Sequence, residues 1–512
     1  MKPIRLASGF FTVGAWTFLS RIFGFVRDIM IAAFLGAGPA AEAFFIAFSL
    51  PNLFRRFFGE GAFNMAFIPQ FSKRVEAGAA PRAYMNDAIA ALAAILVALT
   101  ALATVIMPWL VLAMASGFAG DERFDLAVMF SRITFPYILL ISLAALLSGV
   151  LNATGRFAAA AAAPVLLNVL LIGAMVLADL AGWNIGLTLS ITVPIAGVAQ
   201  LVLLWQAAKR AGYAPQLQWP RFTDEMKQLA IIAAPAALAG GVVQINLLVG
   251  RQVASFFDGA VVWLWFADRL YQLPLGVVGI AIGVVLLPDL SRRLAASDIF
   301  GGRDAFNRAA EISLVFTVPA AVALLVVPIP IVSTLFERGA FGPDDVNPTA
   351  LALAIYAVGL PAFVLQKVLQ PLFFAREDTR SPLNYALVAM VVNAVVAIGL
   401  APLLGFVSAA IATTLAAWVM VVLLWRGSRN MGEETTLDAR FLARAPRIII
   451  ASAAMGLVLY GVAILLTGVI SAPFIRYFAL AALVAAGAIS YAVVGQLIGA
   501  FRLSDLKSAL RR

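Results

Sequence analysis

Basic side chains inside helix-length apolar stretches are the residues of this sequence whose type and spacing could do chemistry. They are Arg21, Arg27, Arg55, Arg56, Arg132, Arg251, Arg269 and Lys367. A charge at the centre of a bilayer costs about 2.5–3.5 kcal/mol on insertion scales, so a group of such residues must face water or protein. Arginine predominates, and its planar guanidinium binds phosphate or carboxylate bidentately and stays ionised in a low dielectric. This pattern predicts a polar cavity that binds an anion such as a phosphate or a pyrophosphate.

Polar residues of the first apolar stretch share one helical face. Thr17, Arg21, Gly24 and Asp28 recur at i, i+4, i+7 and i+11, and Arg27 lies beside them. A polar face of this kind inside a membrane must line a cavity or a protein interface. We therefore predict that Arg21, Arg27 and Asp28 belong to the cavity.

The second stretch is the least regular one. Residues 50–61 combine Pro51, the adjacent Arg55 and Arg56, and Glu60. Proline interrupts a membrane helix, and irregular backbone is tolerated there only where it is buried in protein or lines a cavity. If the helix resumes after Pro51, Arg56 and Glu60 share a stripe that Arg55 flanks. This predicts a broken helix with both arginines in the cavity.

Two later stretches add Arg251 and the adjacent Asp268 and Arg269. A structural alternative is that each arginine only neutralises a carboxylate, as in buried ion pairs. The pairs would be Arg21 with Asp28, Arg56 with Glu60, and Arg269 with Asp268. Basic residues outnumber acidic ones inside the stretches, and the surplus lies in the first, second, seventh and eighth, which favours the cavity. Arg132 and Lys367 are isolated, and pairing or snorkelling explains them equally well.

The composition indicates what must position these side chains. The chain has 512 residues, of which 63% are hydrophobic and 12% charged, and its mean hydropathy is +0.99. Soluble domains carry about 25% charged residues, so the composition predicts an integral membrane protein. The sequence has no His and no Cys, which excludes His-based triads, thiol nucleophiles, Cys/His metal sites and disulfides. No lysine lies in a P-loop context, and we expect no ATP hydrolysis, no cofactor and no enzymatic step.

Apolar stretches of helical length predict an all-α polytopic membrane protein with 14 transmembrane helices. They lie near residues 9–33, 40–70, 84–115, 125–151, 158–180, 184–208, 228–256, 261–290, 308–336, 350–375, 382–402, 405–426, 445–468 and 474–500. Lys and Arg concentrate in the alternate connections that include both termini, whereas the opposite connections hold only Arg123, Arg338 and Arg476. Because cationic loops resist translocation, both termini are expected in the cytoplasm. The net charge of +10 then reflects topology, and no nucleic-acid partner is expected.

Weak internal echoes, about 220 residues apart, indicate a duplication. Residues 68–74 (IPQFSKR), for example, match residues 287–293 (LPDLSRR). A repeat of six helices predicts two lobes related by a pseudo-two-fold axis along the membrane normal, with a substrate cleft between them. The predicted division is an N-lobe at residues 1–220, a C-lobe at 221–430 and two extra helices at 431–512.

Several short motifs are distinctive: SRIFGFVRD at 20–28, GAG at 36–38, EAFF at 42–45, LPNLFRR at 50–56, EGAF at 60–63, FIP at 67–69, TFPYILL at 134–140, ADRL at 267–270, and residues 276–288. Together they resemble the motifs of the MurJ (MviN) family of lipid II flippases, within the multidrug/oligosaccharidyl-lipid/polysaccharide exporter superfamily. The resemblance implies a bacterial inner-membrane protein that moves lipid II, an undecaprenyl-pyrophosphate-linked disaccharide-pentapeptide, to the periplasmic leaflet for peptidoglycan synthesis. It also implies a cationic cavity between the lobes and a groove for the polyprenyl tail beside the last two helices.

The resemblance also implies site residues. By motif position, the essential arginines of the family fall on Arg21, Arg27, Arg55 and Arg269, and its acidic cavity residue falls on Glu42. The acidic position is usually Asp, and a second carboxylate of some members is Gln272 here. Arg251 matches an arginine that only some members carry.

Alternating access between the lobes is the expected mechanism, with the arginines neutralising the pyrophosphate while the tail stays in lipid. The membrane potential, at about 2.3 kcal/mol per charge per 100 mV, or an unidentified ion would supply energy. The expected partners are lipid II, membrane lipids and the cell-wall synthesis machinery. Alternatives are a flippase of another polyprenyl-pyrophosphate glycolipid, a multidrug cation antiporter, a membrane enzyme acting on polyprenyl phosphates, and a structural scaffold. An antiporter would need a carboxylate-rich cavity to attract cations. An enzyme would need paired carboxylates or a metal site. A scaffold would tolerate the loss of charge from the cavity.

Overall fold

The computed structural model describes residues 6–55, 62–216, 218–221, 223–470 and 475–501. Within these ranges the backbone forms α-helices, two short 3-10 helices, connecting loops and one isolated bridge between Arg338 and Phe341, and it forms no strand. In hydrocarbon each backbone N–H and C=O must be satisfied inside its own segment or by a closed barrel, and helices meet this need. The predicted all-α fold is confirmed.

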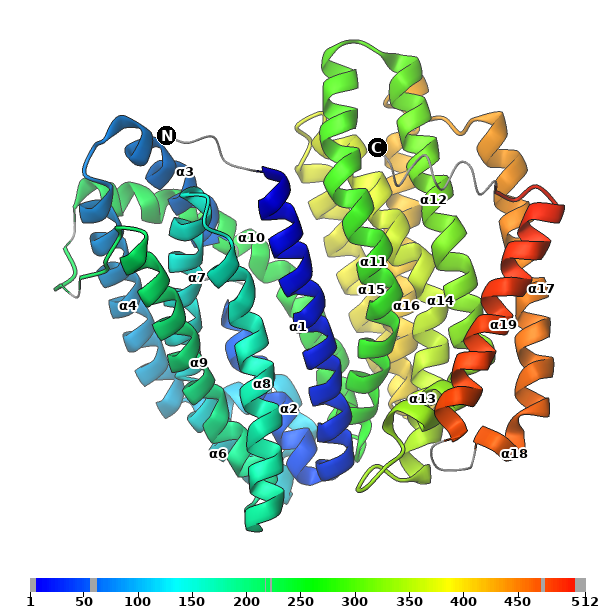
Figure 1. Cartoon of the computed structure of the whole chain (residues 1–512), viewed down its shortest axis with the longest axis horizontal. Helices are drawn as coiled ribbons and strands as arrows, with labels where there is room; N and C mark the ends of the chain where they lie inside the picture. The colour runs from blue at the N-terminus through cyan, green and yellow to red at the C-terminus, as the bar shows by residue number, and fades with distance from the viewer. Residues whose placement is uncertain (1–5, 56–61, 217, 222, 471–474, 502–512) are drawn as a thin grey trace. The chain divides into compact units, whose positions relative to one another are not determined.

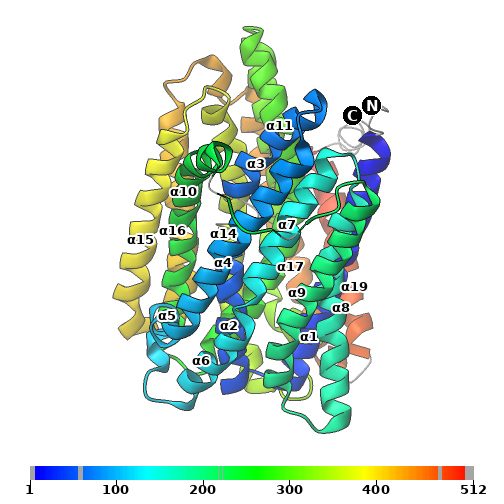
Figure 2. The ribbon, with the colours of Figure 1, turned by 90° about the vertical axis from the view of Figure 1, so that its left-hand side faces the viewer.

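Contacts divide the chain into two units, each of which we describe by itself. The first unit comprises Met1–Val262 and Arg338–Phe341. Its helices are α1 (Leu6–Leu35), α2 (Pro39–Arg55), α3 (Ala62–Ala77), α4 (Pro81–Val105), α5 (Met107–Ala115), η2 (Ser116–Phe118), α6 (Glu122–Thr134), α7 (Tyr137–Ala153), α8 (Ala158–Ala181), α9 (Ile185–Arg210) and α10 (Asp224–Ala254). Helix α1 packs on α8, α2 packs on α6, and α7 and α8 both pack on α9 (Figures 1 and 2).

The second unit comprises Trp263–Glu337 and Gly342–Arg512. Its helices are α11 (Ala260–Ala295), which begins at the boundary, α12 (Ile299–Val326), α13 (Pro328–Phe336), α14 (Pro343–Phe374), α15 (Arg380–Leu404), α16 (Val407–Ser428), η3 (Glu433–Thr435), α17 (Ala439–Leu465), α18 (Thr467–Ile470) and α19 (Ile475–Leu497). Helices α14 and α15 pack on α16, α12 packs on α14 and α17, and α17 packs on α19. The three-part division at residues 220 and 430 stays a prediction.

Proline divides two of the predicted spans, one in each unit. Helix α4 ends at Val105 and α5 begins at Met107, next to Pro108. Helix α12 ends at Val326 and α13 begins at Pro328. A proline lacks the N–H that would continue the helix, so the chain bends and starts a new segment. In both units that segment is 9 residues long.

The predicted break in the second span lies only partly within the described residues. Helix α2 runs through Pro51 without interruption and ends at Arg55. Residues 56–61 lie outside the described ranges, and α3 follows them from Ala62. Arg56, a predicted cavity residue, therefore lies outside the described part of the chain.

Two glycines allow close backbone contact between the end of α1 and the turn at Arg338–Phe341. Gly36 has a φ of +60°, and a Cβ at this position would lie 2.3 Å from the carbonyl oxygen of Ala340. Gly339 has a φ of +56°, and its Cβ would lie 2.1 Å from the carbonyl oxygen of Ala33. Both positions thus need glycine for conformation and for space. The N–H of Ala340 donates to the carbonyl of Ala33 at 2.7 Å, which fixes the turn on α1.

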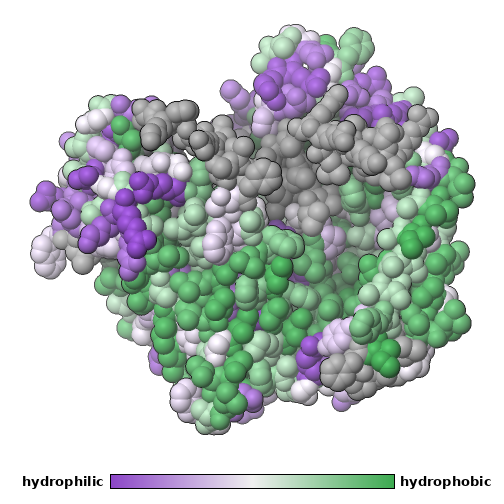
Figure 3. All heavy atoms as spheres, viewed as in Figure 1, coloured by the Kyte–Doolittle hydropathy of each residue, from purple (hydrophilic) through white to green (hydrophobic). Residues whose placement is uncertain are grey.

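The helices carry the surface expected of a membrane protein. Ten helices among the described residues are long and apolar enough to cross a bilayer. The predicted first, second, seventh and eighth spans are not among these ten, and they are the four that hold most of the in-span arginines. Figure 3 shows apolar residues along the flanks of the helices in each unit and hydrophilic residues gathered at their ends.

A buried cluster of charges fixes α17 to α12 in the second unit. The Glu311 side chain is 6% exposed and accepts hydrogen bonds from Arg308 on its own helix and from Arg440 and Arg444 on α17. Tyr491 of α19 donates from its hydroxyl to the main chain of α12 at 2.8 Å. Charge-assisted hydrogen bonds are stronger than neutral ones, so the cluster holds the last two long helices to the unit.

Candidate functional site

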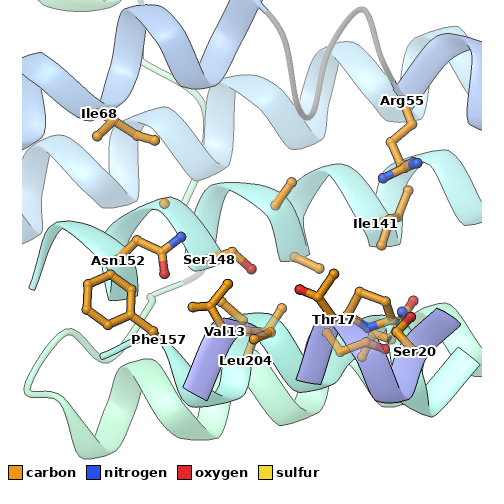
Figure 4. Close-up of a pocket in the computed structure, with 18 of the residues that line it drawn as sticks. Val13, Thr17, Ser20, Arg55, Ile68, Ile141, Ser148, Asn152, Phe157 and Leu204 are labelled. Atoms are coloured by element: carbon orange, nitrogen blue, oxygen red, sulfur yellow. Dashed lines mark hydrogen bonds between the residues drawn. The ribbon is translucent and has the colours of Figure 1, made fainter. Parts of the chain in front are cut away.

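A pocket of about 470 Å³ lies within the first unit, between α1, α2, α3, α7, α8 and α9 (Figure 4). Its volume is in the range of small-molecule sites, about 300–1,000 Å³. Most of the lining is apolar, and a few polar side chains point into it. These are Thr17, Ser20, Arg21, Arg55, Ser148, Asn152 and Gln200.

Two of the predicted arginines line this pocket. Arg21 and Thr17 lie on the polar face of α1, as the spacing predicts, and Arg21 is exposed and forms no hydrogen bond or ion pair within the described residues. Arg55 is the last residue of α2, and Figure 4 shows its side chain directed into the pocket near Ile141. No Asp or Glu is among the described residues that line the pocket. Two guanidiniums without a lining carboxylate create a positive potential that attracts an anion.

Arg27 and Asp28 lie outside the set of lining residues and pair with each other. The Nη2 of Arg27 donates to Oδ1 of Asp28 at 2.6 Å, and its Nη1 donates to Oδ1 of Asn168 on α8 at 2.9 Å. Asn168 in turn donates to the main-chain carbonyl of Ser20 at 3.1 Å. Arg27 is 6% exposed and Asp28 is 2% exposed. This buried network fixes α1 on α8, and Asp28 pairs here with Arg27 and not with Arg21.

The Arg27–Asp28 pair gives a first prediction. The change Arg27→Met should lower the free energy of unfolding by about 3–5 kcal/mol, because it removes the guanidinium that pairs with the buried Asp28 carboxylate. The double variant Arg27→Met/Asp28→Asn should lose clearly less, since the buried carboxylate is removed together with the guanidinium. Thermal unfolding in detergent micelles measures both. A double variant that is less stable than Arg27→Met would contradict the assignment.

Glu42 is held by Arg123 in a separate buried cluster. The Glu42 carboxylate, 1% exposed, accepts from Nη1 of Arg123 at 3.1 Å and from the main-chain N–H of Val261 at 3.3 Å. Arg123 also contacts Asp258 at 2.9 Å, pairs with Asp121 and lies 4.7 Å from the centre of an aromatic ring in η2. Side chains from α2, from η2 and from the connections before α6 and α11 meet at this arginine, and Glu42 is not among the lining residues of the pocket.

Asp121, which pairs with Arg123, lies in the connection before α6. Slight burial raises the pKa of its carboxyl, but hydrogen bonds from the side chain and main chain of Arg123 outweigh this and hold the pKa below its usual value. A lowered pKa means that the carboxylate stabilises the fold above its ordinary pKa. This contribution is lost as the pH falls through the lowered value.

The remaining predicted residues lie elsewhere. Arg251, half-buried, is in the last turn of α10 in the first unit. Arg269 and Asp268 are on α11 in the second unit, where Arg269 lies 4.9 Å from the centre of the Trp265 ring and Asp268 accepts a hydrogen bond from Gln272. No role of Arg27, Arg251, Arg269, Glu42 or Asp28 toward a ligand is tested by these contacts, and each stays a prediction.

Sequence reasoning missed several polar residues of the pocket. Ser148 and Asn152 are four residues apart on α7, and Gln200 comes from α9. Gln200 is buried, accepts from the hydroxyl of Tyr137 at 3.1 Å and donates to the carbonyl of Ala163 at 2.7 Å. The i, i+4 spacing on α7 was a signal in the sequence, but neutral polar residues are common in membrane helices and stand out less than arginines.

Within the described ranges, no group of three or more Asp or Glu side chains is placed to hold a metal ion. A helical chain with many long apolar helices belongs to the class of multi-pass membrane proteins, and a basic internal pocket suits one that binds an anion. Comparison with known proteins narrows this class. The model of the family described as lipid II flippase MurJ matches residues 31–491, and this chain belongs to that family.

Individual relatives agree with the family. The chain is 43% identical over 524 residues to a probable lipid II flippase MurJ of Rhizobium meliloti (strain 1021), with 99% of this chain and 97% of the relative covered. Among solved structures, a lipid II flippase MurJ in an inward closed conformation is 25% identical, with a TM-score of 0.79 and coverage of 95% and 98%. An inward-facing multidrug resistance MATE family transporter is 15% identical, with a TM-score of 0.67, and the match covers 80% of this chain and 94% of the transporter. At this identity the likeness shows the fold alone.

Proposed function

We propose that this protein moves lipid II from the cytoplasmic to the periplasmic leaflet of the bacterial inner membrane. The observation that carries the proposal is the pocket of the first unit, where Arg21 and Arg55 are present without a lining carboxylate in the described residues. Guanidiniums bind the oxygens of a pyrophosphate bidentately, and the mostly apolar lining around them strengthens this attraction. Family membership supports lipid II as the anion-bearing substrate.

The proposed architecture has fourteen crossings, with two six-helix lobes, 1–220 and 221–430, and two extra helices at 431–512. Matching features in the two units support the duplication. Each unit has a span that ends in a proline-divided segment of 9 residues, and the packing of α7 and α8 on α9 resembles that of α14 and α15 on α16. Both termini are proposed to be cytoplasmic, which the distribution of Lys and Arg between alternate connections supports.

The proposed mechanism is alternating access without a covalent step or a cofactor. Arg21 and Arg55 neutralise the pyrophosphate, and Arg27, Arg56, Arg251, Arg269, Glu42 and Asp28 remain predicted substrate-binding residues. The polyprenyl tail stays in lipid beside α17 and α19, which expose large apolar side chains such as Leu457, at 76%. Moving a net charge through the membrane couples transport to the potential, at about 2.3 kcal/mol per charge per 100 mV.

A multidrug cation antiporter is the second candidate that the fold would allow, and the pocket disfavours it. Such a pump would need acidic residues to attract a cation, whereas the charged side chains that line this pocket, among the residues the structure describes, are arginines. A membrane enzyme acting on polyprenyl phosphates would convert the substrate, and a flippase would return it unchanged in the other leaflet.

Reconstitution into liposomes tests the proposal. The full-length protein should transfer fluorescent lipid II between leaflets, as measured by a membrane-impermeant quencher, and chromatography should recover the lipid chemically unchanged. An imposed potential that drives negative charge toward the receiving leaflet should raise the initial rate. Protein-free liposomes are the control for spontaneous transfer, and a permeant cationic dye reports whether the imposed potential is present. Transfer no faster than in protein-free liposomes would refute the proposed function.

A further inference from the structure

The pocket of the first unit has two chemically different ends. Figure 4 shows Arg55 and Ile141 at one end and Asn152, Ser148 and Phe157 toward the other. The first end carries the guanidiniums of the proposed pyrophosphate site. The lining of the second end is neutral, with one hydroxyl, one amide and one aromatic ring.

The two ends are too far apart for a pyrophosphate to occupy both. Ile141 and Asn152 lie on the same helix, α7, and both line the pocket. At a rise of 1.5 Å per residue, they are separated by about 16 Å along the helix axis. If the pyrophosphate binds at Arg55, the neutral end of the pocket is open to the group that is attached to the pyrophosphate.

The polar groups of the neutral end are available for a ligand. Within the described residues the side chains of Ser148 and Asn152 form no hydrogen bond, and their i, i+4 spacing places them on the same face of α7. Asn152 has two donors and an acceptor, and Ser148 adds a hydroxyl. Phe157 supplies an apolar ring beside them. An uncharged group that has several hydroxyls or amides and also an apolar face fits this combination, and a sugar ring has both properties.

We propose that Ser148, Asn152 and Phe157 form a subsite for the sugar attached to the pyrophosphate of the substrate. The inference rests on the proposed function and deepens it, since it assigns one part of the headgroup to one end of the pocket. In this arrangement the arginines supply most of the attraction, and the neutral subsite distinguishes a glycosylated from an unglycosylated polyprenyl pyrophosphate. Losing a hydrogen bond at such a subsite selectively weakens the ligand that uses it.

Binding of two ligands to the full-length protein in detergent micelles tests the subsite. The ligands are lipid II and undecaprenyl pyrophosphate, which lacks the sugars. The double variant Ser148→Ala/Asn152→Leu should bind lipid II about tenfold more weakly, as expected for two lost hydrogen bonds, and should bind undecaprenyl pyrophosphate within about twofold of the unmodified protein. Gln206→Leu, an exposed amide on α9 outside the pocket, is the matched control and should change neither affinity.

The outcomes separate the subsite from the proposed function. Unchanged lipid II affinity in the double variant would overturn the subsite, and so would an equal loss for both ligands, because the effect would then be general. If the unmodified protein binds neither ligand, the proposed function itself fails. Arg21→Ala should weaken both ligands, since both carry the pyrophosphate, and this result shows that the assay detects the cationic end.

Discussion

The double variant Arg21→Ala/Arg55→Ala should transport lipid II more than about a hundredfold more slowly than the unmodified protein, while still inserting in the membrane. Each single change should lower the rate about tenfold, because a charge-assisted hydrogen bond contributes about 1.5–3 kcal/mol and guanidiniums bind phosphate with two. Both residues line the pocket of the first unit, and within the described part of the chain no carboxylate lines it. The initial rate of leaflet transfer in liposomes measures the effect.

Two further variants test whether guanidinium geometry or charge matters. Arg21→Lys/Arg55→Lys keeps the charge and loses the planar fork, so its rate should fall between those of the alanine variant and the unmodified protein. Arg82→Ala removes an exposed arginine of α4 that does not line the pocket, and it should leave the rate unchanged. Full transport by the double alanine variant would show that the headgroup binds elsewhere.

Helical periodicity predicts Thr17 and Arg21 on one polar face of the first helix, and both line the pocket of the first unit, whereas their role toward a ligand stays a prediction. Asp28, on the same face by spacing, is instead buried against Arg27 and belongs to the contact with α8. Periodicity specifies which residues share a face, but it does not specify what lies opposite each turn of that face, and here Asn168 of α8 lies beside Ser20, Gly24 and Arg27 in the middle of the helix.

Arg123 is a residue whose buried ion pairs the sequence does not indicate. The sequence places it in a connection on the side opposite to the termini, where a solvated surface arginine would be ordinary. In the structure its side chain is 8% exposed and contacts three carboxylates from separate parts of the first unit. Glu42 and Asp258 are far from Arg123 in the chain, so no local sequence pattern indicates that they meet at Arg123 together with Asp121. Composition, by contrast, was sufficient for the helical membrane fold, because hydropathy adds up along each segment.

The change Arg123→Met should destabilise the protein by about 3–5 kcal/mol, since it removes the guanidinium from a carboxylate that has almost no access to water. Glu42 is 1% exposed, and in the variant it would still accept the hydrogen bond from the main-chain N–H of Val261, at 3.3 Å, but it would lose the positive charge of Arg123. Asp258→Asn should cost less than about 1 kcal/mol, because the side chain of Asp258 is 93% exposed and its charge is well hydrated without Arg123. The order of these two effects follows from burial, not from distance, since the Asp258 contact is the shorter of the two at 2.9 Å against 3.1 Å.

A double variant separates the cost of an unpaired charge from the cost of lost packing. In Arg123→Met/Glu42→Gln the buried carboxylate is replaced by a neutral amide, so the loss should be smaller than in Arg123→Met alone. The lost contact with the ring of Phe118, 4.7 Å from the Arg123 guanidinium, is common to both variants and cancels in the comparison. Apparent free energies of unfolding in detergent micelles give the three values. If Arg123→Met costs no more than Asp258→Asn, Glu42 does not depend on this arginine, and its position in the first unit must be set by the hydrogen bonds it accepts from the main chain.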